Sequence, residues 1–201
     1  MAHASYENES NFVMLTGLLV KKDRNANNVD SKRPVLDFDV LFHGVDDDGQ
    51  KTICIESIPA LLSGGPLARS LPGLNEGEIF EICGYLRNDP NQGLYVEVAK
   101  LVKLYEHKGV EPIGVSRIRL MEMEMVPNIV ILAGVVTEEK YGMLQVRVER
   151  QQLTRGDLRS EDEIPVDTID QERIPKVGEK ILCTGQACSS SVYADKIYTV
   201  I

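Results

Sequence analysis

The chain of 201 residues contains no tryptophan, only three histidines and no two cysteines with the CxxC spacing. Its Cys and His residues therefore match none of the common zinc-binding patterns. The histidines stand in unrelated contexts without a nucleophile pattern beside them, and the glycine-rich residues 63–66 lack the lysine of a phosphate-binding loop. These absences argue against an enzyme, and we expect neither a metal nor another cofactor.

Long apolar runs are also missing. No stretch approaches the roughly 20 apolar residues that a membrane span requires. The first residues do not combine a basic region with an apolar run, as a secretion signal does. We therefore expect a soluble, cytoplasmic protein without membrane contact. In a reducing compartment we expect no disulfide, and Cys83 and Cys183 are predicted to pack as small apolar side chains.

An excess of positive charge is the third absence. Lys and Arg number 22 against 31 Asp and Glu, which gives a formal net charge of -9. A protein whose whole surface attracts polyanions is therefore excluded, but a local basic patch is not. With 43% hydrophobic and 26% charged residues, the composition is that of an ordinary globular protein of one or two domains.

What the chain does contain is a repeat. Residues 11–19, Asn-Phe-Val-Met-Leu-Thr-Gly-Leu-Leu, return at residues 128–136 as Asn-Ile-Val-Ile-Leu-Ala-Gly-Val-Val. Four further pairs of blocks follow in the same order: 36–40 with 144–148, 53–55 with 164–166, 77–84 with 178–185, and 94–96 with 192–194. A likeness that continues in order indicates two copies of one structural unit.

The apolar residues alternate with period two in nearly every block, which is typical of half-buried strands. Leu36, Phe38 and Val40 share one face, whereas Asp37 and Asp39 share the other. Each repeat is therefore predicted to contain three strands, a short irregular or helical connection, and a two-stranded hairpin. That order matches the oligonucleotide/oligosaccharide-binding (OB) fold, so we predict an all-β chain of two tandem five-stranded OB-fold barrels joined by a linker.

The repeats also set the expected boundaries: a disordered N-terminus at 1–10, a first OB-fold at 11–105, a linker at 106–127 and a second OB-fold at 128–201. Within the linker, alternation over residues 118–125 suggests an extra strand, but its good helix formers fit a helix equally well. Residues 59–71 are expected to carry a short helix that Gly64, Gly65 and Pro66 interrupt.

At this point the residues resemble a known family. The pattern Asn-x-Val-x-Leu-x-Gly at 11–17, with its near copy at 128–134, is similar to the opening strand of bacterial single-stranded DNA-binding proteins. Phe38 and Val40 resemble the family's second strand, and residues 77–84 resemble its Gly-x-x-Val-x-Val-x-Gly strand. Members with two barrels per chain form homodimers, so the resemblance implies a homodimer with four OB-folds that acts in DNA replication, recombination, repair or transfer.

Binding a single strand without reading its sequence requires cations along the backbone and flat aromatic faces for the bases. In the first repeat, the basic residues fall in the long first loop, which flanks the binding cleft in such barrels. They are Lys21, Lys22, Arg24, Lys32 and Arg33. The nearby Asp37 and residues 46–48 partly cancel their field. The alternative is an ordinary solvated loop, since loops are generally rich in charge.

The second repeat carries arginines on and after its second strand, and a tyrosine at the preceding turn. These candidates are Tyr141, Arg147, Arg150, Arg155 and Arg159. Arginine pairs with phosphate and also stacks on bases, so it could replace an absent aromatic platform. The alternative is surface salt bridging, with Glu149, Asp157, Glu161 and Glu163 as partners.

The remaining aromatic residues divide by strand phase. Those at apolar phases are expected in the core: Phe12, Phe38, Phe42 and Phe80. Three further tyrosines are better candidates for base stacking, because a phenol tolerates a half-exposed site: Tyr85, Tyr95 and Tyr193. Tyr95 and Tyr193 occupy matching places in the two repeats, which suggests a shared structural role first.

Two functions remain open from the sequence. The first is a single-stranded DNA-binding protein that acts by phosphate electrostatics and base stacking, with RNA as an alternative ligand. The second is a protein-interaction or assembly module whose barrels have lost strand binding. The acidic net charge, the absence of tryptophan, and Asp37 and Asp39 favour the second. In an intermediate case, the first repeat serves assembly and the second holds DNA.

Overall fold

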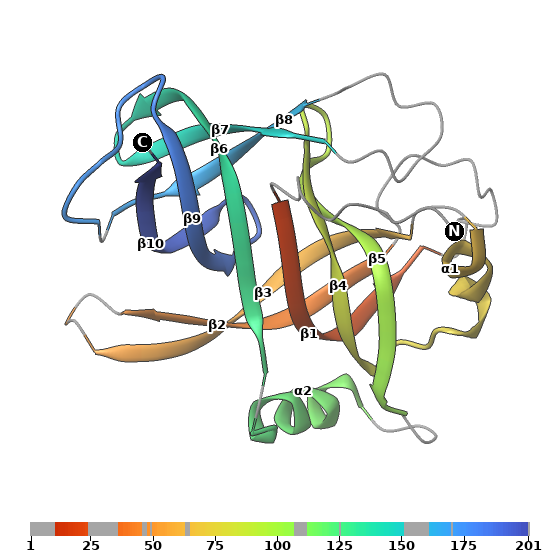
Figure 1. Ribbon diagram of the computed structural model, residues 1–201. Coiled ribbons are helices and arrows are strands. Elements are labelled where there is room, and N and C mark those ends of the chain that lie inside the picture. Colours follow the sequence, from red (N-terminus) through yellow and green to blue (C-terminus); the bar gives the residue numbers. More distant parts are fainter. Residues whose placement is uncertain are drawn as a thin grey trace.

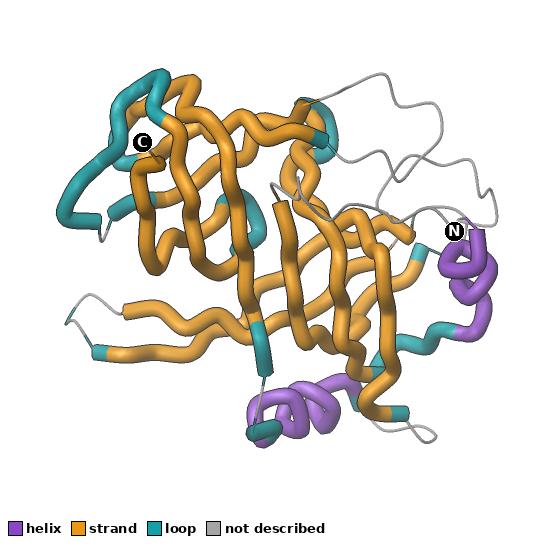
Figure 2. The backbone as a smooth tube through the Cα atoms, viewed as in Figure 1, coloured by secondary structure: helices purple, strands orange, loops and turns teal. Residues whose placement is uncertain are grey.

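A computed structural model describes residues 11–23, 36–45, 48, 50–62, 65–106, 112–124, 126–150, 161–169 and 171–200. Figures 1 and 2 show that strands make up most of this structure and that the helices lie at its periphery. The strands are β1 (Asn11–Lys22), β2 (Leu36–Val45), β3 (Lys51–Leu62), β4 (Ile79–Asp89), β5 (Gly93–Tyr105), β6 (Asn128–Lys140), β7 (Met143–Glu149), β8 (Glu161–Asp167), β9 (Lys180–Ala187) and β10 (Val192–Val200). The α-helices are α1 (Gly65–Ser70) and α2 (Ile113–Glu122), and a 3-10 turn covers Leu71–Gly73.

The duplicated sequence gives a duplicated strand order. In the first repeat, β1 pairs with β2 and β4, β2 pairs with β3, β3 pairs with β5, and β5 pairs with β4, which completes a cycle. In the second repeat, β6, β7, β8, β9 and β10 take the corresponding places. Among the strands that the structure describes, only β3–β5 and β8–β10 are parallel pairs. The expected all-β fold class is therefore confirmed.

The two repeats join through their first strands into one ten-stranded sheet. β1 and β6 run side by side and antiparallel (Figure 1). Val13 faces Val130, Asn11 faces Leu132, and Leu15 faces Asn128, so each repeat presents the same positions to the other. This reciprocal pairing is the arrangement that a two-fold axis produces.

The core follows the period-two pattern. In β1, Val13, Leu15 and Leu19 are buried, and Phe38 meets Phe80 edge to face with ring centroids 6.0 Å apart. The core positions predicted for Phe38 and Phe80 are therefore confirmed. Phe12 was expected in the core, which is wrong: it is half-buried and lies opposite Ile131, because β1 turns the neighbouring Val13 inward.

Two equivalent asparagines stabilise the ends of the central strands. Asn11 Nδ2 donates to Leu86 O at 2.7 Å and Asn11 Oδ1 accepts from Leu86 N at 3.1 Å. Asn128 makes the same pair of bonds with Ala187, at 3.0 and 2.8 Å. Each buried amide thus satisfies both backbone groups of one residue in a neighbouring strand, which accounts for asparagine at the start of both repeats.

Two equivalent glycines permit a close backbone approach. A Cβ on Gly84 would lie 2.2 Å from Glu97 O, and one on Gly185 would lie 2.1 Å from Tyr193 O. Both glycines stand where the strand register shifts, in β4–β5 and in β9–β10. Any side chain would push these strands apart, which explains why the block ends in glycine in both repeats.

The helices differ in part from expectation. Residues 59–62 belong to β3, and α1 begins at Gly65, so Gly65 and Pro66 open this helix and do not interrupt it. Proline is tolerated there because a first-turn N–H has no helical partner to lose. In the linker, the helical alternative is the one that the structure shows, as α2. No helix in the part of the chain that the structure describes is long and apolar enough to span a membrane.

Candidate nucleic-acid interface

The structure describes five of the ten residues predicted to bind nucleic acid. The predictions that lie outside the described residues are Arg24, Lys32, Arg33, Arg155 and Arg159. The described ones are Lys21, Lys22, Tyr141, Arg147 and Arg150. They fall into two groups, because some face solvent and others are held by contacts inside the fold.

Lys21 and Arg147 are cations at the surface with carboxylate neighbours. Lys21 Nζ lies 3.3 Å from Asp37 Oδ2, and its side chain is 74% exposed. Arg147 Nε lies 3.7 Å from Glu161 Oε2, and both side chains are about half exposed, at 46% and 50%. Exposed ion pairs of this kind contribute about 0–1 kcal/mol to stability, so a phosphate could replace the carboxylate at little cost.

Lys22 and Arg150 are instead held by contacts with neighbouring groups of the fold. Lys22 Nζ donates to the carbonyl oxygens of Pro72 and Leu74 at 3.3 and 3.0 Å. Arg150 Nε lies 3.4 Å from Asp162 Oδ2, and these two side chains are only 6% and 1% exposed. The sequence could have indicated the burial of Arg150, because Arg150 comes two residues after the buried Val148 and so shares its strand phase.

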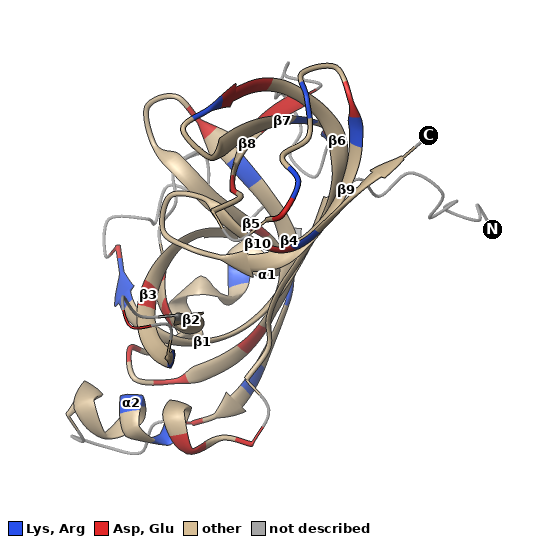
Figure 3. Ribbon diagram, turned by 90° about the vertical axis from the view of Figure 1, so that its left-hand side faces the viewer, with Lys and Arg blue, Asp and Glu red and all other residues tan. Residues whose placement is uncertain are grey.

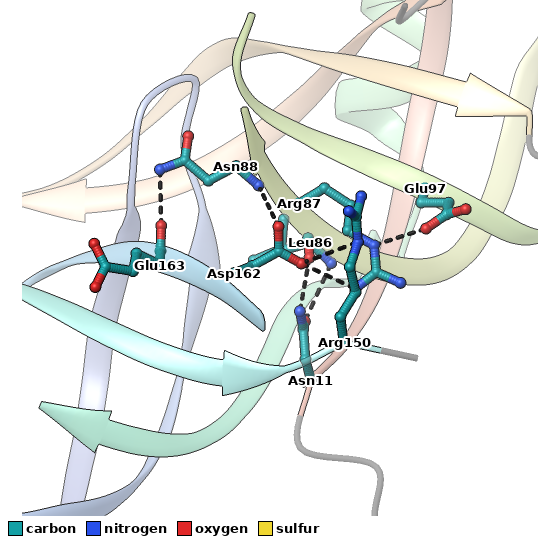
Figure 4. A network of polar contacts seen from close by, with 8 residues as sticks. All are labelled: Asn11, Leu86, Arg87, Asn88, Glu97, Arg150, Asp162 and Glu163. Atoms are coloured by element: carbon teal, nitrogen blue, oxygen red, sulfur yellow. Dashed lines mark hydrogen bonds and ion pairs between the residues drawn. The ribbon is translucent and has the colours of Figure 1, made fainter. Parts of the chain in front are cut away.

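Arg150 belongs to a buried polar network between the two repeats (Figure 4). Arg87 of β4 is fully buried and donates through Nε to Glu97 Oε2 at 2.7 Å and through Nη1 to Asp162 Oδ2 at 3.3 Å. Burial raises the pKa of Asp162, and the neighbouring Arg150 and Arg87 oppose this rise. Since Arg87 and Glu97 come from the first repeat and Asp162 from the second, the network joins the two.

Tyr141 stands at the tip of the β6–β7 hairpin. Its φ is 54° and that of Gly142 is 78°, the pair of positive values that a tight two-residue hairpin turn needs. The ring is 91% exposed, and Lys140 Nζ lies 5.3 Å from its centroid. An open aromatic face beside an ammonium group suits a stacked base and its phosphate. Lys140 was not among the predicted residues, although it adjoins Tyr141 in the sequence.

Other tyrosines are less accessible. Tyr95 is 6% exposed, and burial raises its pKa, so its predicted half-exposed position is wrong. The Tyr193 ring packs edge to face on Phe42 with centroids 5.4 Å apart. Phe42 was predicted in the core of its own repeat but is half-buried in this contact between repeats.

The β2–β3 hairpin of the first repeat docks on the second repeat, passing beneath β9 and β10 in Figure 1. His43 N donates to Gln186 Oε1, and Gln186 Nε2 donates to His43 O, each at 2.9 Å. Ser189 N donates to Glu56 Oε2 at 3.3 Å. Part of this hairpin therefore contacts the second repeat.

In the first repeat, α2 packs over part of the outer side of β1 and β2. Arg117 Nε lies 2.7 Å from Asp39 Oδ2, and the Asp39 side chain is only 5% exposed. Leu120 of α2 is buried in one cluster with Leu18, Leu41 and Ile79. Asp39, which was expected to weaken an open ligand face, is thus the partner of a helix that covers part of that face.

Both signs of charge are interspersed over the two repeats (Figure 3). Among the described residues, no group of three or more His, Cys, Asp or Glu side chains could hold a metal ion. Cys183 is buried, as predicted, and burial raises its pKa to about 12. Burial likewise raises the pKa of Cys188 to about 12, so at neutral pH neither thiol is a ready nucleophile.

Comparison with known proteins finds a likeness in structure. The wild-type single-stranded DNA binding protein from Thermus aquaticus matches with a TM-score of 0.61 at 17% identity, over 95% of this chain and 93% of that chain. A deletion mutant of the same protein matches with a TM-score of 0.62 at 16% identity, over 95% and 94%. No protein-family model and no curated protein matches the sequence. At this level of identity the likeness shows the fold.

Proposed function

We propose that the chain is a non-enzymatic single-stranded DNA-binding protein that acts in DNA replication, recombination, repair or transfer. The observation that carries the proposal is the likeness to the Thermus protein over nearly the whole of both chains. Each five-strand cycle has the pairing order of an OB-fold, so we interpret the chain as two tandem barrels. The reciprocal β1–β6 junction supports this interpretation, because it brings two equivalent units together.

In this proposal the second repeat offers the main contact surface. Tyr141 stacks on a base, while Lys140 and Arg147 pair with phosphates. The other proposed cations are Lys21 of β1 and five residues outside the described ranges, namely Arg24, Lys32, Arg33, Arg155 and Arg159. Lys22 and Arg150 take structural roles, because their charged groups are already held by carbonyl oxygens and by Asp162.

A fluorescence titration with labelled oligo-dT at two salt concentrations tests the proposal. We expect binding at low salt that weakens as salt rises, with a logarithmic slope of about -0.7 for each phosphate contacted. No binding at low salt would reject the proposal. Oligo-U in place of oligo-dT measures the preference between DNA and RNA.

Two matched variants locate the surface. Tyr141→Ala should weaken oligo-dT binding about tenfold, since stacking on an aromatic side chain is worth about 1–3 kcal/mol per base. Tyr198→Ala serves as its control, because Tyr198 is also exposed, at 52%, but lies on β10. If both substitutions weaken oligo-dT binding equally, the proposed DNA path along the β6–β7 hairpin is contradicted.

We also propose that the chain forms a homodimer through the outer face of the β1–β6 junction. There Met14 lies opposite Ile129, and Phe12 lies opposite Ile131. Ile129 and Ile131 are each 42% exposed, and adjacent exposed apolar side chains mark an interface with another protein. The dimer would hold four OB-folds.

Light scattering tests the homodimer. Replacing both Ile129 and Ile131 by Lys should give monomers, because four charges would meet across a two-fold interface. Ile174→Lys is the control, since Ile174 is 43% exposed but lies outside the junction. A wild-type chain that is monomeric at micromolar concentration would contradict this part of the proposal.

A protein-interaction module is the second candidate function. It is favoured by α2, which covers part of the outer side of β1 and β2 and pairs Arg117 with Asp39. Under this reading, the homodimer forms but oligo-dT does not bind at low salt. The salt titration therefore separates the two candidates.

A further inference from the structure

The second repeat has an open hollow at the place where the first repeat holds α2. In the first repeat, α2 rests on what we call the α2 seat, which consists of Leu18, Asp39, Leu41, Ile79 and Tyr105. Leu120 enters its apolar part, Arg117 pairs with Asp39, and the Arg119 guanidinium lies 4.7 Å from the Tyr105 ring centroid.

The strand registers identify the equivalent positions in the second repeat. Leu18 faces Asp39 on one side and Ile79 on the other. At the matching place in β6, Val135 faces Arg147 and Lys180. Val135 therefore corresponds to Leu18, Arg147 to Asp39, and Lys180 to Ile79.

The remaining two positions follow in the same way. Ile79 faces Tyr105 in β4–β5, and Lys180 faces Val200 in β9–β10. Glu149 comes two residues after Arg147, as Leu41 comes two residues after Asp39. We call this set the open seat: Val135, Arg147, Glu149, Lys180 and Val200. All five line a hollow of about 400 Å³.

The exchanged side chains explain why a helix like α2 does not fit the open seat. Asp39 is replaced by Arg147, which would face Arg117 of such a helix with like charge. Ile79 is replaced by Lys180, so a second cation borders the hollow. Val135 and Val200 keep an apolar floor. The open seat thus keeps apolar residues at the equivalents of Leu18 and Tyr105 and reverses the charge at its ion-pairing position.

We propose that the open seat docks an amphipathic helix of another protein. That helix carries carboxylates where α2 carries Arg117 and Arg119, and an apolar side chain where α2 carries Leu120. A second copy of this chain is a poor occupant, because its α2 would bring Arg117 against Arg147. The apolar floor favours a helix with an apolar face over a nucleic-acid backbone.

This inference goes beyond DNA binding and is tested separately from it. Arg147 borders the open seat and also belongs to the proposed DNA path, whereas Lys180 belongs only to the seat and Tyr141 only to the path. Substitutions at Lys180 and Tyr141 therefore distinguish a failure of one proposal from a failure of the other.

The probes are two fluorescent peptides of residues 112–124, each stapled between positions 118 and 122, which are exposed in α2. A staple is needed because so short a helix is unstable alone in water. One peptide is native, and the other carries Arg117→Glu and Arg119→Glu. We expect the full chain to bind the acidic peptide at least tenfold more tightly than the native one in an anisotropy titration.

Substitution of residues in the open seat gives the decisive comparison between the two peptides. Lys180→Glu should weaken binding of the acidic peptide at least tenfold. Lys196→Glu should leave this binding unchanged, because Lys196 is exposed on β10 and lies outside the hollow. The triple substitution Arg147→Asp, Glu149→Leu and Lys180→Ile restores three of the five positions of the α2 seat and should reverse the preference toward the native peptide. Thermal unfolding checks that every variant is folded.

The opposite results are equally clear. If neither peptide binds the unchanged chain, or if Lys180→Glu leaves the acidic peptide unaffected, the helix proposal is overturned. If oligo-dT binding depends on Lys180 and no peptide binds, the open seat is part of the nucleic-acid path instead. Loss of oligo-dT binding in Tyr141→Ala with peptide binding intact supports two separate surfaces.

Discussion

The two repeats share one strand order but differ in the use of one surface. In the first repeat, part of the outer side of β1 and β2 is covered by α2 through the Arg117–Asp39 pair and Leu120. In the second repeat, the equivalent side is an open hollow bordered by Arg147 and Lys180. A few side chains at fixed register positions thus decide whether a duplicated surface binds its own chain or remains open.

The residues that are the same in both repeats have a different role from the residues that are exchanged. Asn11 and Asn128 make the same backbone bonds, and Gly84 and Gly185 permit the same close approach. These residues act on the backbone, so any change would break the strand cycle itself. The seat residues face outward, where a substitution leaves the cycle intact and changes only what the surface binds.

The largest effect should come from breaking the network that joins the repeats. Arg87→Met would leave Glu97 buried without its cation, and removing one partner of a buried ion pair costs about 3–5 kcal/mol. Urea unfolding measures the loss. The control is the double variant Arg87→Met with Glu97→Leu, which removes the orphaned charge and should cost less. A double variant that is no more stable than the single one would contradict this account.

A slightly smaller effect tests the equivalence of the two repeats. Gly84→Ala and Gly185→Ala should each lower the free energy of unfolding by about 3 kcal/mol, because the new Cβ meets a backbone carbonyl that cannot move away cheaply. Gly73→Ala is the control, since its Cβ would contact nothing within 4 Å. If only one of the paired glycines were sensitive, the two strand crossings would not be equivalent.

Sequence patterns predicted those features that depend on one strand alone. Alternation placed Phe38 and Phe80 inside, and the ordered repeat predicted an all-β chain of two similar halves. Strand phase alone also held the information that Arg150 points inward with Val148. The arginine-rich composition of that stretch hid this information, because the residues were interpreted as one cluster.

Features that depend on contacts between strands could not be read from the sequence. Asp39 looked like an obstacle to ligand binding, and only the fold shows that Arg117, 78 residues away, pairs with it. The correspondence of Ile79 with Lys180 is visible in the aligned blocks. Its consequence appears only when the registers place Ile79 beside β1 and Lys180 beside β6.

An intermediate effect tests the closed side of the comparison. Leu120→Ala should destabilise the chain by about 2–4 kcal/mol, because it removes a fully buried side chain from the cluster with Leu18, Leu41 and Ile79. Ile118→Ala on the exposed side of α2 is the control. Hydrogen exchange should show loss of protection first in α2, and uniform loss over both repeats would contradict a local role for the seat.

The smallest effect concerns an equivalent pair of glutamates, one buried and one partly exposed. Burial raises the pKa of Glu78, but hydrogen bonds from Lys103 and Asn75 outweigh it and hold that pKa below its ordinary value of 4.5. A lowered pKa in the folded state stabilises the fold above the ordinary value, and this contribution is lost as pH falls through the folded value. Glu78→Gln should therefore cost about 1.5 kcal/mol at pH 7 and less at pH 3.

Glu179 provides the matched comparison at the same position of the second repeat. Its side chain is 26% exposed and lies 3.4 Å from Arg173, whereas the Glu78 side chain is fully buried and lies 2.6 Å from Lys103 Nζ. Water can replace the contacts of Glu179, so Glu179→Gln should cost less than Glu78→Gln in urea unfolding at pH 7. Each glutamate also accepts a hydrogen bond from the backbone N–H of the residue three positions earlier. Equal losses of stability in the two variants would show that the glutamates act through this shared turn and that the ion pairs contribute nothing to stability.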